Sequence, residues 1–342
     1  MSTSVAAPER HSVRTGPRFT ISRGLLTVSL ALALLLVASA VVAPTSVSRS
    51  ALLGMLPFAA VLAIVALGQT LVVQQGGIDL SVPGAVSLSV VITTHQPAGN
   101  DDRLLGAMAF GLAVAVAFGV VNGLLVGRLG LNPIVATLGT SALMYAMVLN
   151  ISGGSPRRTT ELLRGIAGGV SFGVPNSVYI ALVVIVVASV AMKMTATGRR
   201  FEAIGANRAA AAAIGLPVLL HQAGAYVCAQ VLYWLGGVLL SGIIAQPTAF
   251  QGDAYLLPSV AAVVLGGTSL LGGRGFLVPT AIAALFLSQL EQFVLALGVS
   301  FAVRTLVEAA ALTVGVALYS VDWRSLRQRL ASSGTRTAAS ST

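Results

Sequence analysis

The chain has few residues that could carry out covalent chemistry or hold a metal ion. Its three histidines, His11, His95 and His221, lie far apart in the sequence, and Lys193 is the only lysine. The sequence contains no G-x-x-x-x-G-K-[ST] loop for nucleotide phosphates, no H-E-x-x-H zinc motif and no G-x-S-x-G nucleophile turn. We therefore expect that the chain is not an enzyme and that it holds no metal and no cofactor of its own.

One acidic residue, Asp79, stands in a glycine-rich break between two apolar stretches. A charged side chain at membrane depth is costly and is usually functional. Asp79 also lies just before an expected helix, where a carboxylate caps backbone N–H groups and interacts with the positive end of the helix dipole. The sequence favours this capping role over direct contact with a substrate, and both roles stay open at this stage.

Uncharged polar residues interrupt several of the apolar stretches. Their amide and hydroxyl groups suit a neutral, hydrogen-bonding solute such as a sugar. The same residue types also hold neighbouring membrane helices together, and the pattern does not separate the two roles. The candidate pathway or gate residues are Gln69, Thr70, Gln74, Asn122 and Thr137, together with Asp79.

The composition excludes a soluble or disordered protein. Of the 342 residues, 56% are hydrophobic and only 9% are charged, whereas about a quarter of the residues in soluble domains are charged. The single cysteine, Cys228, excludes a scaffold held by internal disulfides. Because a spanning helix needs about 20 apolar residues, we expect an all-α polytopic membrane protein with about ten transmembrane helices.

The apolar runs place these helices at intervals along the chain. With the N-terminus inside, 14 of the 20 lysines and arginines fall on the inner side, as the positive-inside rule requires. We expect both termini to be cytoplasmic, a disordered basic tail at 1–23, a transmembrane domain at 24–321, a basic tail at 322–342 and a large external loop at 152–175. The expected helices are 24–43, 52–73, 82–94, 104–126, 133–150, 177–192, 217–244, 255–265, 276–297 and 301–321.

Two glycine-rich breaks, at 74–81 and 266–275, adjoin the short helices 82–94 and 255–265. Similar residues flank both breaks, which points either to a weak internal repeat or to coincidence in a chain rich in Gly, Ala, Leu and Val. Paired broken helices in a membrane protein typically line a transport pathway. The candidate hinges or close-packing points are Gly76, Gly77, Gly266 and Gly267.

The segment 193–216 is unlike the rest of the chain, because it combines several basic residues with helix-forming ones, a phenylalanine and an acid. The expected topology places this segment on the cytoplasmic side. A short helix on the inner membrane face fits this composition. Such a helix either binds anionic lipid or provides a docking surface for a soluble partner.

At this point the sequence resembles the permease subunits of bacterial ABC importers of the ribose/xylose/galactose type, a family that also includes autoinducer-2 permeases. The resemblance spans roughly residues 50–322. It departs from the usual family pattern at Pro83, where glycine is common, and at Arg274, where lysine is common. The matching blocks are 68–73 with 77–82, 122–126 with 133–139, 198–215, 246–248, and 261–270 with 272–275.

The resemblance implies a multi-pass protein of the bacterial cytoplasmic membrane that imports a ribose-type monosaccharide, a small polyol or an autoinducer-2-like solute by alternating access. The partners implied are a second permease subunit, identical or different, a cytoplasmic ABC ATPase that binds ATP and Mg, and an extracytoplasmic solute-binding protein. Phe201 is expected as an exposed apolar anchor on the ATPase. The ATPase-coupling residues implied are Gly198, Arg199, Phe201, Glu202, Ala203, Gly205, Asn207, Ala210, Ala211 and Gly215.

Two other classes of protein stay open. An ion-gradient-driven secondary carrier of a small neutral solute would need no ATPase. A scaffold or receptor subunit would transport no solute.

Overall fold

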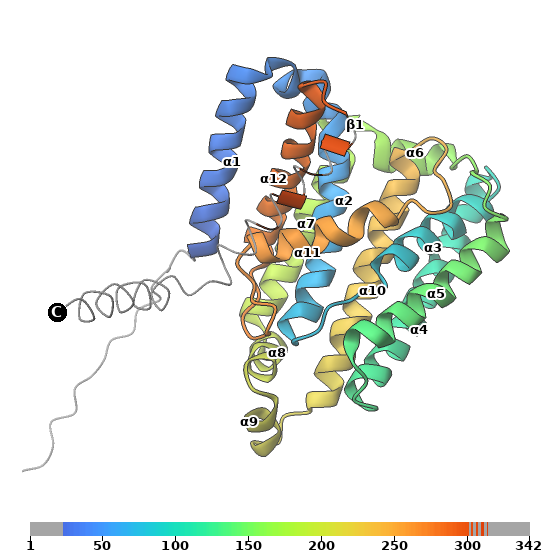
Figure 1. The fold of residues 1–342 in the computed structure, drawn as a ribbon. Helices are drawn as coiled ribbons and strands as arrows, with labels where there is room; N and C mark the ends of the chain where they lie inside the picture. Colours follow the sequence, from blue (N-terminus) through green and yellow to red (C-terminus); the bar gives the residue numbers. More distant parts are fainter. Residues whose placement is uncertain (1–22, 301, 304–305, 307–308, 311–312, 314–342) are drawn as a thin grey trace, which may run out of the picture.

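The computed structural model describes residues 23–300 together with 302, 303, 306, 309, 310 and 313. Nearly all of the described chain is helical (Figure 1). The α-helices are α1 (Arg23–Val42), α2 (Arg49–Gln74), α3 (Val82–His95), α4 (Leu104–Gly127), α5 (Pro133–Ser152), α6 (Glu161–Gly168), α7 (Asn176–Met194), α8 (Ala196–Ala206), α9 (Arg208–Ala213), α10 (Val218–Ile243), α11 (Leu256–Leu265) and α12 (Leu277–Ala296). The short elements are the 3-10 helices η1 (Pro44–Val47), η2 (Asp101–Arg103) and η3 (Asp253–Tyr255) and the strands β1 (Val170–Ser171) and β2 (Val174–Pro175).

Within the described residues, seven helical segments are long and apolar enough to cross a membrane, and α3 and α11 are shorter apolar helices. The prediction of an all-α polytopic membrane protein is therefore confirmed. Most of the expected helix at 301–321 lies outside the described residues, and the tails at 1–22 and 322–342 lie wholly outside them. The number of ten helices and the sidedness of the termini stay predictions.

Local sequence signals explain where several helices begin and end. At the start of α5, the Asn132 side chain accepts a hydrogen bond from the Ile134 N–H (2.9 Å), and Pro133 occupies the first turn, where a missing N–H costs nothing. The same helix ends at Gly153 in a left-handed conformation (φ 59°), which glycine adopts without strain.

The loop expected at 152–175 contains more structure than the sequence indicated. It forms α6, whose first turn is capped by the Thr160 hydroxyl, and an antiparallel pair in which β1 faces β2. Phe172 (φ 52°) and Gly173 (φ 81°) form the turn of this hairpin, and the Phe172 side chain is fully exposed. Two-residue hairpins favour such positive φ values because they match the twist of the strands.

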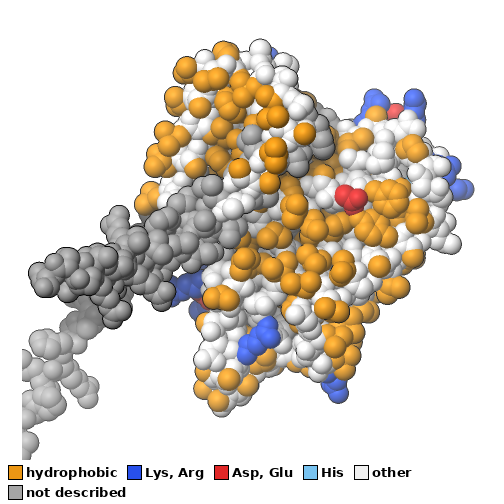
Figure 2. Space-filling model, in the orientation of Figure 1, with side chains coloured by type: hydrophobic (Ala, Val, Ile, Leu, Met, Phe, Trp, Pro, Cys, Tyr) orange, Lys and Arg blue, Asp and Glu red, His pale blue; other side chains and the backbone are white. Residues whose placement is uncertain are grey.

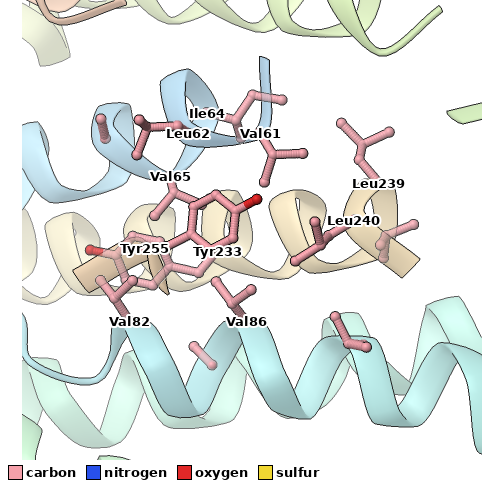
Figure 3. Packing of buried hydrophobic residues seen from close by; sticks show 14 of the residues in the cluster. Val61, Leu62, Ile64, Val65, Val82, Val86, Tyr233, Leu239, Leu240 and Tyr255 are labelled. Atoms are coloured by element: carbon pink, nitrogen blue, oxygen red, sulfur yellow. The ribbon is translucent and has the colours of Figure 1, made fainter. Parts of the chain in front are cut away.

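At the centre of the molecule, α10 packs against α2 on one side and against α3 on the other (Figure 3). The middle of α2 is completely buried, whereas α1 and α7 are exposed along most of their length. On the face shown in Figure 2, hydrophobic side chains are widespread and most charged side chains lie at the margins, but one acidic side chain lies within the face. The core side chains shown are Val61, Leu62, Ile64 and Val65 of α2, Val82 and Val86 of α3, Tyr233, Leu239 and Leu240 of α10, and Tyr255.

Helices α4 and α10 approach each other at two glycines of α4. A Cβ atom added at Gly119 or Gly123 would lie 2.6 Å from the Cα atom of Val227 or Ala223, respectively. Small residues spaced four apart let membrane helices pack backbone to backbone.

We expect Gly123→Val to lower the stability of the detergent-solubilised protein by about 1–3 kcal/mol, because the added methyl groups overpack this contact. The matched control is Gly106→Val on the same helix, where nothing lies within 4 Å of the added Cβ. The measurement is the temperature of half-aggregation by size-exclusion chromatography. Equal losses for both variants would contradict the close contact.

Candidate functional site

The segment 193–216 forms two helices, α8 and α9, at the end of the bundle where α7 ends and α10 begins (Figure 1). The Thr195 hydroxyl caps α8 by accepting from the Gly198 N–H (3.0 Å). The Asn207 side chain caps α9 by accepting from the Ala210 N–H (3.0 Å). Because Asn207 has an extended backbone (φ −158°), the chain bends between α8 and α9. The sequence predicted a single helix for this segment.

Helix α8 is attached to the first glycine break, which follows α2. The side-chain amide of Gln75 donates to the Phe201 carbonyl oxygen (2.9 Å), and both residues are buried. The guanidinium group of Arg208 donates to the Gln75 carbonyl oxygen. One residue of the break therefore binds both α8 and the start of α9.

The second glycine break reaches the same place. The Gly273 N–H donates to the Gln74 carbonyl oxygen (3.0 Å), so the two breaks are joined by a backbone hydrogen bond across about 200 residues of sequence. Gly205 packs against both breaks, because a Cβ there would overlap the Gln74 carbonyl oxygen and lie 3.3 Å from the Gly273 carbonyl oxygen. We name residues 74–76, 201–208 and 272–274 the junction.

The junction also contains an ion pair between Arg274 and Glu202 (3.2 Å). The Arg274 side chain is largely exposed and that of Glu202 is about half exposed, so solvent screens the pair and it adds little to stability. The tight backbone contact at Gly205 and the buried Gln75 hydrogen bond are the specific features of the site.

The four glycines expected as hinges or packing points divide into two kinds. Gly76 (φ 76°) and Gly267 (φ 89°) adopt left-handed conformations, which glycine tolerates best. Gly77 and Gly266 are close-packing points. A Cβ added at Gly77 would lie 2.8 Å from the Tyr226 hydroxyl oxygen, and one added at Gly266 would lie 2.7 Å from the Thr280 backbone nitrogen.

The expected exposure of Phe201 is wrong. Its side chain is only 8% exposed, because it packs against Leu67 and Leu71 of α2, with Leu277 of α12 in the same cluster. Sequence reasoning assigned this apolar residue to a partner because it stood in a polar segment, whereas the chain itself buries it.

The other expected coupling residues take several positions. The Glu202 carboxylate pairs with Arg274, and the Asn207 side chain caps α9. Sequence reasoning missed Ile214, which is 75% exposed after the last turn of α9, although an isolated branched apolar residue after an alanine run was a signal. Of the remainder, Arg199, Ala203, Ala210 and Gly215 are exposed, Gly205 is partly buried, and Gly198 and Ala211 are buried.

A cluster of hydrogen-bonded polar side chains lies inside the helix bundle, around the hydroxyl of Ser81. This hydroxyl donates to Asp79 Oδ1 (2.5 Å) and accepts from the side-chain amides of Asn122 (3.3 Å) and Gln230 (2.6 Å). Its one proton and two lone pairs are thus all used. The Thr140 hydroxyl donates to Asn122 Oδ1 (2.7 Å). We name these five residues the Ser81 cluster; sequence reasoning did not single out Ser81 or Thr140.

Asp79 is fully buried in this cluster. Its Oδ1 atom accepts the Ser81 N–H (2.8 Å) as well as the hydroxyl, which fixes the turn before α3. Ser81 is the N-cap residue of α3 and no side chain caps the first turn of this helix, so the expected cap by Asp79 is wrong. Its second oxygen accepts no hydrogen bond from the described residues, and none of the described basic residues pairs with it. The side chain of Gln69, with its amide nitrogen toward Tyr233, bonds the main-chain N–H and carbonyl of Asp79.

The six expected pathway residues fall into two places. Gln69, Asp79 and Asn122 belong to or border the Ser81 cluster, and the Thr137 hydroxyl accepts from the adjacent Leu80 N–H (2.8 Å). Thr70 and Gln74 instead face the second break, near Thr280 and Gly275. All six are buried, so none lines an open pathway in this conformation. Within the described part of the chain, no group of three or more His, Cys, Asp or Glu residues could hold a metal ion.

Comparison with known proteins identifies the family. Residues 51–321 match the family described as "Branched-chain amino acid transport system / permease component". The chain is 34% identical to the "Probable ABC transporter permease protein y4mJ" of Sinorhizobium fredii, over 80% of this chain and 83% of the relative. It is 34% identical to the "Ribose import permease protein RbsC" of Escherichia coli (84% and 91%) and 29% identical to the "Autoinducer 2 import system permease protein LsrD" of Photorhabdus laumondii (79% and 86%). No solved structure matches the chain. The chain therefore belongs to the family of branched-chain amino acid transport system permease components, which are multi-pass transporter subunits of the inner membrane and not enzymes.

Proposed function

We propose that the chain is the pore-forming permease subunit of an ATP-driven importer. Its cargo is a ribose-type monosaccharide or a related small polyol or autoinducer-2-like solute, moved by alternating access. The names of relatives that import ribose, fructose and autoinducer 2 support this cargo class. The junction is the observation that carries the proposal, because it connects a partner-accessible segment to both broken-helix regions of the bundle.

The partner at this segment is a cytoplasmic ATPase, which binds ATP and Mg²⁺ in its own chain. The exposed side of α8 and α9 combines the basic residues Arg199 and Arg200 with small alanines and the apolar Ile214. Small side chains allow another protein to approach closely, and arginine is enriched among interface hot spots.

The junction explains how the ATPase would change the pore. A force on α8 acts on Gln75 through the buried hydrogen bond and on Gln74 and Gly273 through the contact at Gly205. The helix pairs α2–α3 and α11–α12 therefore respond together. An ATPase that binds one arrangement of the junction better than the other shifts the population of the two states.

The remaining proposed partners are a second permease subunit, identical or different, which completes the pore, and an extracytoplasmic solute-binding protein, which delivers the cargo. The α8–α9 end is then cytoplasmic and the end with α6 and the β1–β2 hairpin is external. A tenth helix at 301–321 would return the C-terminus to the cytoplasmic side.

The direct test is uptake of radiolabelled ribose and fructose by proteoliposomes that contain this chain, its ATPase and its binding protein. We expect uptake to require ATP on the α8–α9 side and to survive collapse of proton and sodium gradients. Uptake that needs an ion gradient and no ATP would establish the secondary carrier instead, and no uptake of any solute would favour a scaffold subunit.

Ile214→Asp is expected to weaken ATPase binding at least tenfold, equivalent to about 1.4 kcal/mol, because a carboxylate would replace the exposed apolar side chain of the proposed contact. The control is Phe172→Asp, which changes a fully exposed apolar residue at the opposite end of the molecule. Pull-down of the ATPase with each detergent-solubilised variant measures the effect. Unchanged binding by Ile214→Asp would indicate that α9 contacts only lipid.

A further inference from the structure

An acidic residue outside the described clusters, Asp253, lies at the start of η3, between α10 and α11. The sequence analysis gave only a short connection here, between the expected helices 217–244 and 255–265. In the structure the loop turns inward, because the buried N–H of Gly252 donates to the Ser87 hydroxyl in the middle of α3 (2.9 Å). A Cβ at Gly252 would lie 2.8 Å from that hydroxyl oxygen, so only glycine fits here.

The depth of Asp253 follows from its partner on α5. The Tyr145 hydroxyl donates to Asp253 Oδ1, and Tyr145 lies seven residues before the end of α5 at Ser152. At 1.5 Å per residue, this distance is about 10 Å along the helix from its external end. Asp253 is nevertheless exposed, on a loop that leads into α11 on the side of the bundle turned to the viewer in Figure 1.

An exposed carboxylate at this depth restricts what can cover the surrounding face. Charged side chains within a membrane face the interior of the bundle or a water-filled cavity rather than lipid. None of the described basic residues forms an ion pair with Asp253, so the charge is not neutralised locally. The face around Asp253 therefore meets water or another protein chain.

The neighbours of Asp253 supply the remaining groups of a binding site for a hydroxylated solute. The ring of Phe250 is 42% exposed and lies 5.6 Å from the Tyr145 ring in a tilted arrangement. The Gln251 side-chain oxygen accepts from the Thr248 hydroxyl (3.0 Å), which leaves its amide nitrogen available as a donor. The site thus offers an acceptor, a donor and an aromatic face.

We propose that Asp253, Gln251 and Phe250 form a solute-contact site on the translocation pathway, in which the Asp253 carboxylate accepts hydrogen bonds from the hydroxyl groups of a neutral polyhydroxylated solute. Tyr145 is the positioning residue, because it fixes one carboxylate oxygen and leaves the other for the solute. The assignment of the solute class depends on the proposed function, and the exposure of Asp253 to water does not.

Thiol labelling tests the exposure. In a Cys228→Ala background in lipid nanodiscs, a charged, membrane-impermeant maleimide is expected to label Asp253→Cys at least tenfold faster than Val183→Cys. Val183 is the matched control, because it is 61% exposed and lies seven residues from the external end of α7. Phe172→Cys gives the rate of a fully exposed thiol. Labelling of Asp253→Cys as slow as that of Val183→Cys overturns the proposal, as does efficient disulfide linkage of two Asp253→Cys copies without labelling.

Transport tests the chemistry, with ribose and fructose as the probes. Asp253→Leu is expected to lower the maximal uptake rate at least tenfold with little change in the half-saturating concentration, because the binding protein captures the solute first. Asp253→Asn is expected to stay within about fivefold of the unsubstituted protein, since its one amide oxygen has two lone pairs, one for the Tyr145 hydroxyl and one for a solute hydroxyl. Equal loss in both variants would show that the charge is required and would overturn a neutral solute at this site.

If the unsubstituted protein transports neither sugar, the proposed cargo class fails and with it the solute assignment, while labelling still decides whether Asp253 faces water.

Discussion

Replacing Gly205 with alanine is expected to abolish ATP-coupled uptake while the protein still inserts into the membrane and folds. The added Cβ would overlap the Gln74 carbonyl oxygen, and overpacking of this kind costs about 1–3 kcal/mol. Alanine favours a helix by about 0.5–1 kcal/mol relative to glycine, so α8 itself stays helical and moves away from the two glycine breaks. Arginine at the same position has the same effect in a more severe form.

The measurement pairs the rate of ribose uptake with the yield of monodisperse protein, so that lost coupling is distinguished from lost folding. Gly224→Ala in α10 and Gly139→Ala in α5 are matched controls, because nothing lies within 4 Å of a Cβ added at either position. Both controls are expected to transport normally. If Gly205→Ala also transports at the normal rate, the junction does not transmit movement from α8 to the breaks.

Asp79→Ala is expected to lower the free energy of unfolding by about 2–4 kcal/mol, whereas Asp79→Asn is expected to stay close to the unsubstituted protein. Alanine removes the acceptor for the Ser81 N–H and hydroxyl, and this leaves two buried donors unpaired. Asparagine keeps an oxygen in the same place. The readouts are thermal stability in detergent and the rate of uptake.

This pair of variants separates the two roles that the sequence left open for Asp79. If Asp79 only positions α3, Asn restores both stability and uptake. If Asp79 contacts the solute through its charge, Asn restores stability and uptake is still lost. Asp102→Ala, an exposed acid near the start of α4, is the control and is expected to change stability by less than about 0.5 kcal/mol.

The junction changes how the segment 193–216 is interpreted. From the sequence alone it is a polar docking segment in which the exposed Phe201 side chain contacts a partner. In the structure the Phe201 side chain is buried and packs this segment against α2 of the same chain, and Ile214 is the exposed apolar residue. The two residues have similar hydrophobicity, and only their long-range neighbours assign one to the core and the other to the surface.

The sequence by itself determined the class of the protein and most of its elements. Apolar runs of about 20 residues form membrane helices because a helix satisfies its backbone hydrogen bonds within the segment, so α2, α4, α5, α7, α10 and α12 were predictable within a few residues. The glycine breaks were also visible, because they depend on residues only a few positions apart. The helix α6 and the β1–β2 hairpin were missed, since the glycine-rich segment around them has no long apolar run.

Tertiary structure alone decided which of these features meet. The bond between Gly273 and Gln74, the contact of Gly205 with both breaks and the pairing of Tyr145 with Asp253 join residues about 70 to 200 positions apart. No local pattern encodes such contacts, because in a chain built from Gly, Ala, Leu and Val many helix faces are equally apolar. The arrangement is instead selected by close packing at the few glycines and by the requirement that each buried polar group finds a partner.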